Sequence, residues 1–476
     1  MRYLEIFKQL NAVPRPSHHE ERVADFLCQF ALNLGLQYDR DEHNCVVIRK
    51  PATPGHENAT PIVILNHMDM VCVAEPGKTF DPLNDPIEAY VDGEWMRARG
   101  TSLGADNGIG LSMALAILED DTIVHGPLEV ITITNEEDGM TGAANLSPDF
   151  IKGRKVINLD SEDYDTITTG AAGAYLQIHH LPLTRVPAPS GQLRWYNIDI
   201  DGGRGGHSGV DINKGRASAT TLMWALLSAI GDDDVVNLAD LSIGEANASI
   251  ASSAHAVVCL EDDGSDALLK AREEHFNQWL REEYGTTDPG LRCRITPAQP
   301  SKSIISSDDV DALLTALEQI PQGVVKMSED MPGTVETSNN VGRITADRRE
   351  FTISTHTRSF IEDDMVALGE QIRDIFAEQG ATTELVMSAP AWQENQHSDF
   401  LRLTSDTFND VLGWRPRMVA MHFVLEAGFF VQKFPGIEMA SIGPKIVEPH
   451  STGEHVKLST CTDIWNVTIE LLRRLA

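Results

Sequence analysis

The sequence predicts an α/β fold in which a largely parallel sheet flanked by helices is interrupted by an inserted α+β domain. Three observations support this prediction. The chain has 476 residues, more than one ordinary hydrophobic core holds. Its first part alternates short apolar runs with helical patterns, which is typical of parallel sheets. After about residue 185 the pattern changes, and the last part of the chain resembles the opening part again.

The first part begins with a predicted helix. Ser17-His18-His19-Glu20 has the spacing of a capping box, apolar residues follow at helical intervals, and Gly35 is suited to end the helix. Short apolar runs then predict strands, and a helix is expected between the second and third of them. The predicted strands are 45–48, 61–65, 128–134 and 156–159, and the helix spans about 108–118.

The inserted section is more varied. We expect a strand at 193–200, a glycine-rich turn at 202–209, helices at about 214–230, 266–283, 308–320 and 361–379, and a strand at 350–357. A strand at 439–442 and a helix near 462–475 complete the first domain. We therefore divide the chain into 1–185 (first part), 186–390 (inserted domain) and 391–476 (second part).

Composition excludes several classes of partner. The net charge of −33 argues against nucleic acid and anionic membranes, because both bind through positive patches. The six cysteines form no C-x-x-C pair, which indicates reduced thiols. The first residues lack the pattern of a signal peptide, and no apolar run approaches the length of a membrane span. We therefore expect a cytoplasmic protein.

Polar clusters follow several of the predicted strands. In the first, His67 and Asp69 are two residues apart in an extended segment and face the same way, so Asp69 can hold one ring nitrogen while the other binds a metal. In the second, Asp106 lies between glycines just before a helix, where a simple helix N-cap is the alternative interpretation.

Two acidic clusters follow later strands. Glu136 and Glu137 come after the run at 130–133, and their side chains point differently, so that one can bind metal while the other handles a proton. Asp160 follows the run at 156–159, where a solvated acidic loop is the alternative. Because functional residues gather at the carboxyl ends of parallel strands, these groups are expected to meet. Histidine and carboxylate ligands suit zinc, with manganese or cobalt as substitutes.

Read together, these motifs resemble the dinuclear-zinc aminoacylase and dipeptidase family, and within it the branch of bacterial aminoacyl-histidine dipeptidases. The resemblance covers essentially the whole chain. It includes Leu-Gly-Ala-Asp-Asn-Gly-Ile-Gly at 103–110 and Gly-Gly-His-Ser-Gly at 205–209, with further matching segments at 48–53, 125–130, 335–338, 340–342 and 441–444.

The resemblance implies two Zn²⁺ ions per chain and a role for each site residue. His67 and Asp160 would bind one ion, Glu137 and His450 the other, and Asp106 would bridge both, with a cis peptide bond to Asn107. His450 enters only through this resemblance. Asp69 would orient His67, and Glu136 would be the general base rather than a ligand.

The inserted domain would then act as a lid. By the same resemblance, His207 would stabilise the oxyanion, whereas an incidental histidine in a glycine-rich hairpin is the alternative. Asn340 and Arg358 match positions that hold the substrate backbone or carboxylate, and Arg suits a bidentate carboxylate clamp. His422 opens the segment His422-Phe-Val-Leu-Glu-Ala-Gly428, where the family has His-Ala-Gly-Leu-Glu-Cys-Gly.

The segment 422–428 differs from the family sequence, and Thr-Gly-Glu at 452–454 stands in place of the family's Pro-Asp-Glu. Both differences put the preference for a C-terminal histidine in doubt. The expected function is metal-dependent hydrolysis of unblocked dipeptides, including Xaa-His types such as β-alanyl-histidine. The alternatives are a tripeptidase or N-acyl-amino-acid deacylase of the same family, and an inactive metal-dependent binding protein. The expected partner is a small peptide, and relatives include homodimers.

Overall fold

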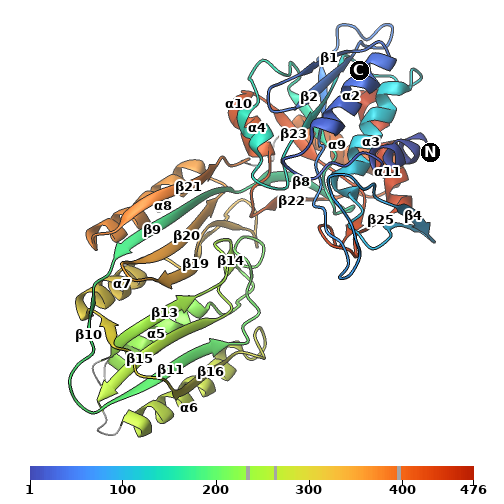
Figure 1. Ribbon diagram of the computed structural model, residues 1–476. Coiled ribbons are helices and arrows are strands. Elements are labelled where there is room, and N and C mark those ends of the chain that lie inside the picture. Colours follow the sequence, from blue (N-terminus) through green and yellow to red (C-terminus); the bar gives the residue numbers. More distant parts are fainter. Residues whose placement is uncertain (232–235, 262–264, 394–397) are drawn as a thin grey trace. The chain divides into compact units, whose positions relative to one another are not determined.

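The computed structural model describes residues 1–231, 236–261, 265–393 and 398–476, and the chain forms two compact units (Figure 1). Unit 1 consists of residues 1–171, 392–420 and 426–476. Unit 2 consists of residues 172–391 and 421–425. The chain therefore enters unit 2 after completing part of unit 1 and later returns to finish it.

Unit 1 is built on an eight-stranded mixed sheet in the order β1-β2-β6-β3-β7-β23-β8-β22. The four central strands, β6, β3, β7 and β23, run parallel, and antiparallel pairs flank them. The strands span Gln37–Arg40 (β1), Val46–Lys50 (β2), Ile62–His67 (β3), Leu128–Ile133 (β6), Lys155–Asn158 (β7), Thr166–Ala171 (β8), Arg417–Met421 (β22) and Glu438–Ser441 (β23). The predicted α/β class with a largely parallel sheet is confirmed.

Both faces of this central sheet are covered, which explains its continuous apolar runs. Every residue of β3 and of β6 is buried. Ile62 and Ile64 belong to the main core of unit 1, whereas their neighbours Val63 and Leu65 point to the opposite face and are also fully buried. The helices of this unit are α1 (Arg2–Leu10), α2 (Glu21–Asn33), α3 (Ala105–Glu119), α4 (Thr141–Asn145), α9 (Asp399–Leu412), α10 (Ala427–Lys433) and α11 (Leu458–Arg474).

The predicted capping box differs from the observed start of α2. Glu20, not Ser17, is the N-cap residue, and no side chain caps the helix. The Ser17 hydroxyl instead donates to Asp69 Oδ2 (2.8 Å), and Glu20 Oε1 accepts from the backbone of His18 and Asn135. The Ser17 hydroxyl thus donates a charge-assisted hydrogen bond to a buried carboxylate, which ties the segment before α2 to the loop after β3.

A small sheet that the sequence did not predict lies in unit 1. Its order is β24-β25-β5-β4, with β4 at Ala89–Asp92, β5 at Trp95–Ala98, β24 at Ile446–Val447 and β25 at His455–Lys457. Through the pairing of His455 with Arg97, it brings the end of the chain beside the loop that precedes α3.

Unit 2 contains a sheet in which every described pair is antiparallel, in the order β16-β11-β15-β13-β19-β20-β9-β21, with β18 also paired to β19. Helices α5 to α8 pack against it over one shared core, and Figure 1 shows α8 running along β9, β20 and β21. The strands are Gly173–Pro182 (β9), Leu193–Asp201 (β11), Asn237–Ile243 (β13), Ala254–Glu261 (β15), Arg292–Pro297 (β16), Gly323–Met327 (β18), Val335–Ala346 (β19), Glu350–Ser359 (β20) and Thr382–Ala389 (β21).

The helices of unit 2 are α5 (Ala219–Gly231), α6 (Ser265–Tyr284), α7 (Ser307–Gln319) and α8 (Glu362–Glu378). Two short ribbons complete it: β10 (Arg185–Pro187) with β17 (Ser303–Ile305), and β12 (Gly206–His207) with β14 (Ser249–Ile250). The expected boundary at residue 185 falls after β9, whereas β9 pairs with β20 and β21 and so belongs to unit 2.

Within the described ranges, none of the helices combines the length and apolar character needed to span a bilayer.

Candidate metal centre

The parallel strands of unit 1 bring several polar side chains to one edge of the sheet. His67 is the last residue of β3, Glu136 and Glu137 follow the end of β6, and Asp160 follows β7. Because these strands are parallel, their carboxyl ends meet at the same edge. Asp106 reaches this edge from the first turn of α3, where its peptide bond to Asn107 is cis.

Asp106 lies between two histidines. Its Oδ1 is 3.1 Å from Nε2 of His67, and its Oδ2 is 3.0 Å from Nε2 of His450. Gly104 is the N-cap residue of α3 and no side chain caps this helix, so the described contacts of the Asp106 oxygens are to histidines and not to the helix backbone. One carboxylate thus presents a separate oxygen to each imidazole.

The two histidines each face a further carboxylate. His67 Nε2 is 3.3 Å from Asp160 Oδ1, and His450 Nε2 is 2.8 Å from Glu137 Oε2. Two groups of potential ligand atoms result, His67–Asp106–Asp160 and Asp106–Glu137–His450, and they share Asp106. The structure therefore brings together all five residues predicted as metal ligands.

Asp69 organises the loops around this cluster. It is fully buried, and its Oδ1 lies 3.4 Å from Nδ1 of His67. The same oxygen accepts from the backbone N–H of Glu136 (3.1 Å), and Oδ2 accepts from the N–H of Glu137 (3.2 Å) and from Ser17. One carboxylate thus fixes both the His67 ring and the Glu136–Glu137 turn.

At this edge of the unit 1 sheet, carboxyl groups outnumber the groups that can carry a positive charge. Two imidazoles lie among the carboxyl groups of Asp69, Asp106, Glu136, Glu137, Asp160 and Glu426. Burial raises the pKa of Glu136 and of Asp160 well above the ordinary range. Repulsion from neighbouring carboxylates adds to this increase, whereas the attraction of His67 opposes it. Hydrogen bonds to Asp106 and Glu137 raise the pKa of His450 to about 11. A donor set of two imidazoles and several oxygens, short of cations, fits divalent ions such as zinc.

Two buried groups hold the loop that carries Asp106. Glu454 accepts four backbone N–H groups: Oε2 binds those of Leu103 (2.7 Å) and Gly104 (2.9 Å), and Oε1 those of Ala105 (2.7 Å) and Asp106 (3.3 Å). On the other side, the Arg15 guanidinium donates to the carbonyls of Gly104, Met68 and Asp69. A side chain at Gly104, whose φ is +68°, would lie 2.5 Å from Arg15 Nη2, so this close approach requires glycine.

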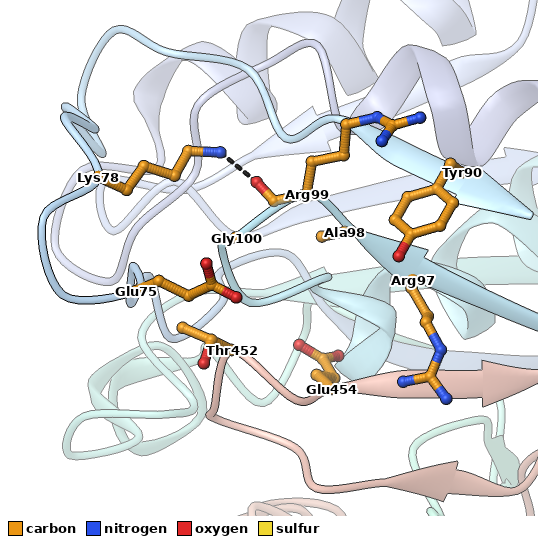
Figure 2. Close-up of a pocket in the computed structure, with 9 residues that line it drawn as sticks. All are labelled: Glu75, Lys78, Tyr90, Arg97, Ala98, Arg99, Gly100, Thr452 and Glu454. Atoms are coloured by element: carbon orange, nitrogen blue, oxygen red, sulfur yellow. Dashed lines mark hydrogen bonds between the residues drawn. The ribbon is translucent and has the colours of Figure 1, made fainter. Parts of the chain in front are cut away.

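Glu454 also lines a polar cavity of about 430 Å³. Figure 2 shows its carboxylate on the wall beside Thr452, with Glu75, Lys78 and Arg99 on other sides. Both Glu454 oxygens are engaged by the backbone of the Asp106 loop. The cavity therefore borders a structural support of the metal centre.

In unit 2, the contacts of His207 determine the tautomer and the protonation state of its ring. Its Nδ1 accepts from the backbone N–H groups of Gly209 and Val210 (both 3.1 Å), which leaves the proton of the neutral ring on Nε2. Desolvation, and then the positive charge of Arg358, lowers the pKa of His207 to about 4. His207 is thus a neutral donor near pH 7. A side chain at Gly209 would lie 2.1 Å from the His422 carbonyl, which explains a glycine there.

The other predicted residues of unit 2 lie in different environments. Arg358 is 3% exposed, and its described hydrogen bonds go to Ser208 (3.4 Å) and His356 (3.5 Å), neither of which is anionic. His422 Nε2 pairs with the Ser338 hydroxyl (2.8 Å). Asn340 is fully buried, and its amide contacts Ser249 O (2.8 Å) and Gln322 (3.4 Å), so its substrate role stays a prediction.

Comparisons with known proteins identify the class. Residues 63–474 match peptidase family M20/M25/M40. The chain belongs to this family and is a metallopeptidase.

Its similarity to individual members extends over the full length. It is 34% identical over 471 residues to the cytosol non-specific dipeptidase of Escherichia coli (strain K12), covering 99% of this chain and 97% of the relative. The crystal structure of an aminoacylhistidine dipeptidase from Vibrio alginolyticus superposes with a TM-score of 0.92 at 32% identity, covering 99% and 96% of the two chains. An aminopeptidase PepT from Bacillus cereus shares the fold, with a TM-score of 0.62 at 17% identity and coverage of 100% and 98%.

Sequence reasoning missed several residues of this centre. Arg15, Ser17 and Glu454 support its loops, and Glu426 places a carboxylate beside Glu136 and Asp160. The only sequence signal for Glu426 and Glu454 was their position in the two segments that resemble family motifs.

Proposed function

We propose that this metallopeptidase hydrolyses unblocked dipeptides, including Xaa-His types, with two zinc ions held at the edge of the unit 1 sheet. The observation that carries the proposal is the shared carboxylate of Asp106, whose two oxygens each face one histidine. Full-length similarity to two dipeptidases supports the substrate class. His67 and Asp160 would hold one ion, Glu137 and His450 the other, with Asp106 between them.

Each residue of unit 1 has a distinct part in the proposed reaction. Divalent cations held by His67, Asp160, Glu137, His450 and Asp106 would supply Lewis acidity for the scissile carbonyl and for the attacking water. Glu136 accepts the proton of that water and delivers it to the nitrogen of the leaving amino acid. Asp69 would orient His67, since its Oδ1 lies 3.4 Å from Nδ1 while Nε2 faces the centre.

Unit 2 would contribute substrate-binding groups. The neutral His207 ring donates its Nε2–H to the oxyanion that develops as the carbonyl is attacked. Arg358, a buried cation whose described partners are uncharged, suits the terminal carboxylate of the substrate. His422 lies on the same unit, held by Ser338.

A substrate panel tests the proposal. Zinc-loaded protein is offered dipeptides, tripeptides and N-acetyl-amino acids, and dipeptides should give the highest kcat/KM. Cleavage confined to acetylated substrates would contradict the proposed substrate class. Manganese- and cobalt-loaded protein on the same panel then decides whether zinc is the better ion.

A second experiment separates catalysis from coordination. Glu136→Gln should abolish turnover while elemental analysis still finds two metal ions per chain. Loss of one metal would mean that Glu136 is a ligand. Glu137→Gln is the matched variant, and it should lose metal as well as activity.

A further inference from the structure

The polar cavity of about 430 Å³ beside Glu454 lies wholly within unit 1. Its volume is in the range of small-molecule sites. The proposed reaction involves its lining only through Glu454, which supports the Asp106 loop. Three cations and two carboxylates line the cavity: Lys78, Arg97, Arg99, Glu75 and Glu454.

The segments that carry these charges are held by backbone pairing. The N–H of Lys78 donates to the Glu75 carbonyl (3.0 Å) and closes a turn, and the N–H of Glu75 donates to the Gly100 carbonyl (3.0 Å). On the other side, Arg97 pairs with Tyr90 in the ladder between β4 and β5. The side chains of the lining therefore start from fixed backbone positions.

Glu75 and Lys78 carry opposite charges in the same cavity without pairing. A side chain at Gly100 would lie 3.0 Å from Lys78 Cδ and 3.2 Å from Glu75 Oε2, so both side chains reach the same part of the wall. The Lys78 ammonium donates to the Arg99 carbonyl, and within the described ranges neither charge forms an ion pair. One carboxylate and one ammonium are thus free for a ligand.

Two arginines on the opposite side are also available. Figure 2 shows the side chains of Tyr90, Arg97 and Arg99 across the cavity from Glu75. The Arg99 guanidinium lies over the Tyr90 ring, 4.6 Å from its centroid, which positions the charge without neutralising it. Arg97 Nε is 3.4 Å from Asp92 Oδ2, but Asp92 is exposed, and such surface pairs contribute little.

We propose that this cavity binds a free acidic amino acid. Such a ligand has two carboxylates and one ammonium group, the reverse of a lining in which cations outnumber carboxylates by one. The oxygens of Glu454 already accept four backbone N–H groups, so Glu75 is the acceptor for the ammonium group. Lys78 and the two arginines bind the carboxylates through charged hydrogen bonds.

Occupancy of the cavity regulates the metal centre through Glu454. Free amino acids are the products of dipeptide hydrolysis, so this regulatory role rests on the function proposed above. A ligand carboxylate in the cavity repels the Glu454 carboxylate, whose hydrogen bonds hold the loop that ends at Asp106. Binding therefore loosens that loop and lowers kcat, whereas an amino acid bound at the metal centre would compete with the substrate and raise KM.

Two ligands that differ only in the ammonium group, L-glutamate and glutarate, test the site on zinc-loaded enzyme. L-Glutamate should lower kcat for alanyl-alanine, and glutarate should act at least about 10-fold more weakly because it lacks the charged hydrogen bond to Glu75. Glu75→Gln should remove this preference for L-glutamate, and Lys78→Gln should weaken both ligands about 10-fold. Lys8→Gln, at an exposed position on α1, is the matched control that should keep wild-type inhibition.

Several outcomes would overturn the proposal. These are purely competitive inhibition by L-glutamate, equal potency of glutarate, equal potency of inorganic phosphate, or a decrease in kcat that survives both Glu75→Gln and Lys78→Gln. Calorimetric titration of L-glutamate into the same proteins separates the site from the proposed function. If wild-type enzyme cleaves no dipeptide, the dipeptidase function fails, whereas L-glutamate binding that requires Glu75 and Lys78 still supports the site.

Discussion

Replacing Glu454 with glutamine is expected to loosen the metal centre without touching a metal ligand. Glu454 accepts four backbone N–H groups from the loop that ends at Asp106, two on each oxygen. A glutamine amide keeps one oxygen and turns an NH₂ group toward the other two donors. Two charged hydrogen bonds are therefore lost, and two N–H groups are left buried without acceptors.

The magnitude follows from those two bonds. Hydrogen bonds to a charged acceptor contribute about 1.5–3 kcal/mol each, so the gross loss is about 3–6 kcal/mol. Burial of Glu454 and its repulsion with Asp106 raise the pKa of this carboxyl, and their relief offsets part of the loss. We expect a net decrease of about 2–4 kcal/mol in the unfolding free energy, and metal binding about 10- to 100-fold weaker because Asp106 loses its support.

Two measurements check this prediction. Urea unfolding of the metal-loaded protein gives the stability, and competition with a chelating dye gives the metal affinity. Glu75→Gln is the matched control, because Glu75 is an exposed carboxylate lining the same cavity as Glu454. A Glu454→Gln protein with wild-type metal affinity and a wild-type urea midpoint would refute the positioning role.

Three other predictions concern the metal, the pocket and the pH dependence. Chelation should inactivate the enzyme reversibly, with activity returning in proportion to metal measured by elemental analysis; activity that survives complete metal removal would contradict the mechanism. Phe423 packs edge-on against His207 (ring centroids 6.3 Å apart), so Phe423→Ala should enlarge the space beside His207. The ratio of the KM values for small and bulky dipeptides should then change by about 3- to 30-fold. An unaltered substrate ranking would exclude a role of Phe423 in the pocket. Burial lowers the pKa of His179 from its ordinary value of 6.5 to about 3. Between pH 6.5 and about pH 3, His179 is therefore protonated in the unfolded chain but not in the folded chain. The unfolding free energy should therefore fall by up to about 1.4 kcal/mol per pH unit as the pH drops through this window. His179→Gln should remove this dependence of stability on pH. Glu384→Gln, at an exposed position on the neighbouring strand, is the control variant that should keep it. Urea titrations at pH 7, 6 and 5 measure that slope, and an unchanged slope in His179→Gln would contradict the assignment.

The sequence was most informative where a rule acts over a few residues. His67 and Asp69 were predicted to share a face because they lie two apart in a strand, and the structure places Oδ1 of Asp69 3.4 Å from the ring. The continuous apolar runs predicted buried central strands. Both predictions depend on local periodicity, which a single sequence displays directly.

Other elements were missed for identifiable reasons. Strand β19 contains the fully buried polar run 338–340, in which the Ser338 hydroxyl pairs with His422 and the Asn340 amide oxygen accepts from Gln322. Hydropathy cannot reveal a strand whose interior is polar. Helix α1 carries Tyr3, Ile6, Phe7 and Leu10 at helical spacing, so the signal was present although no helix was predicted there.

The positions of Glu426 and Glu454 could not be predicted by any local rule. Each acts on residues hundreds of positions away, Glu426 on Asn158 and Glu454 on the loop before α3. Their carboxylates look like any other among 71 acidic residues. Only the order of strands in the sheets brings them to the centre.

That order also determines when the centre can exist during synthesis. Strand β23 lies between β7 and β8, although the chain makes all of unit 2 before it reaches β23. Asp106 and His450 are 344 residues apart. Four of the five proposed metal ligands are therefore synthesised before unit 2, and the centre cannot be complete until His450 has been added to the chain. Contacts this distant in sequence also make folding of unit 1 slow, so exposure of its unfinished sheet edge is the stage most prone to aggregation.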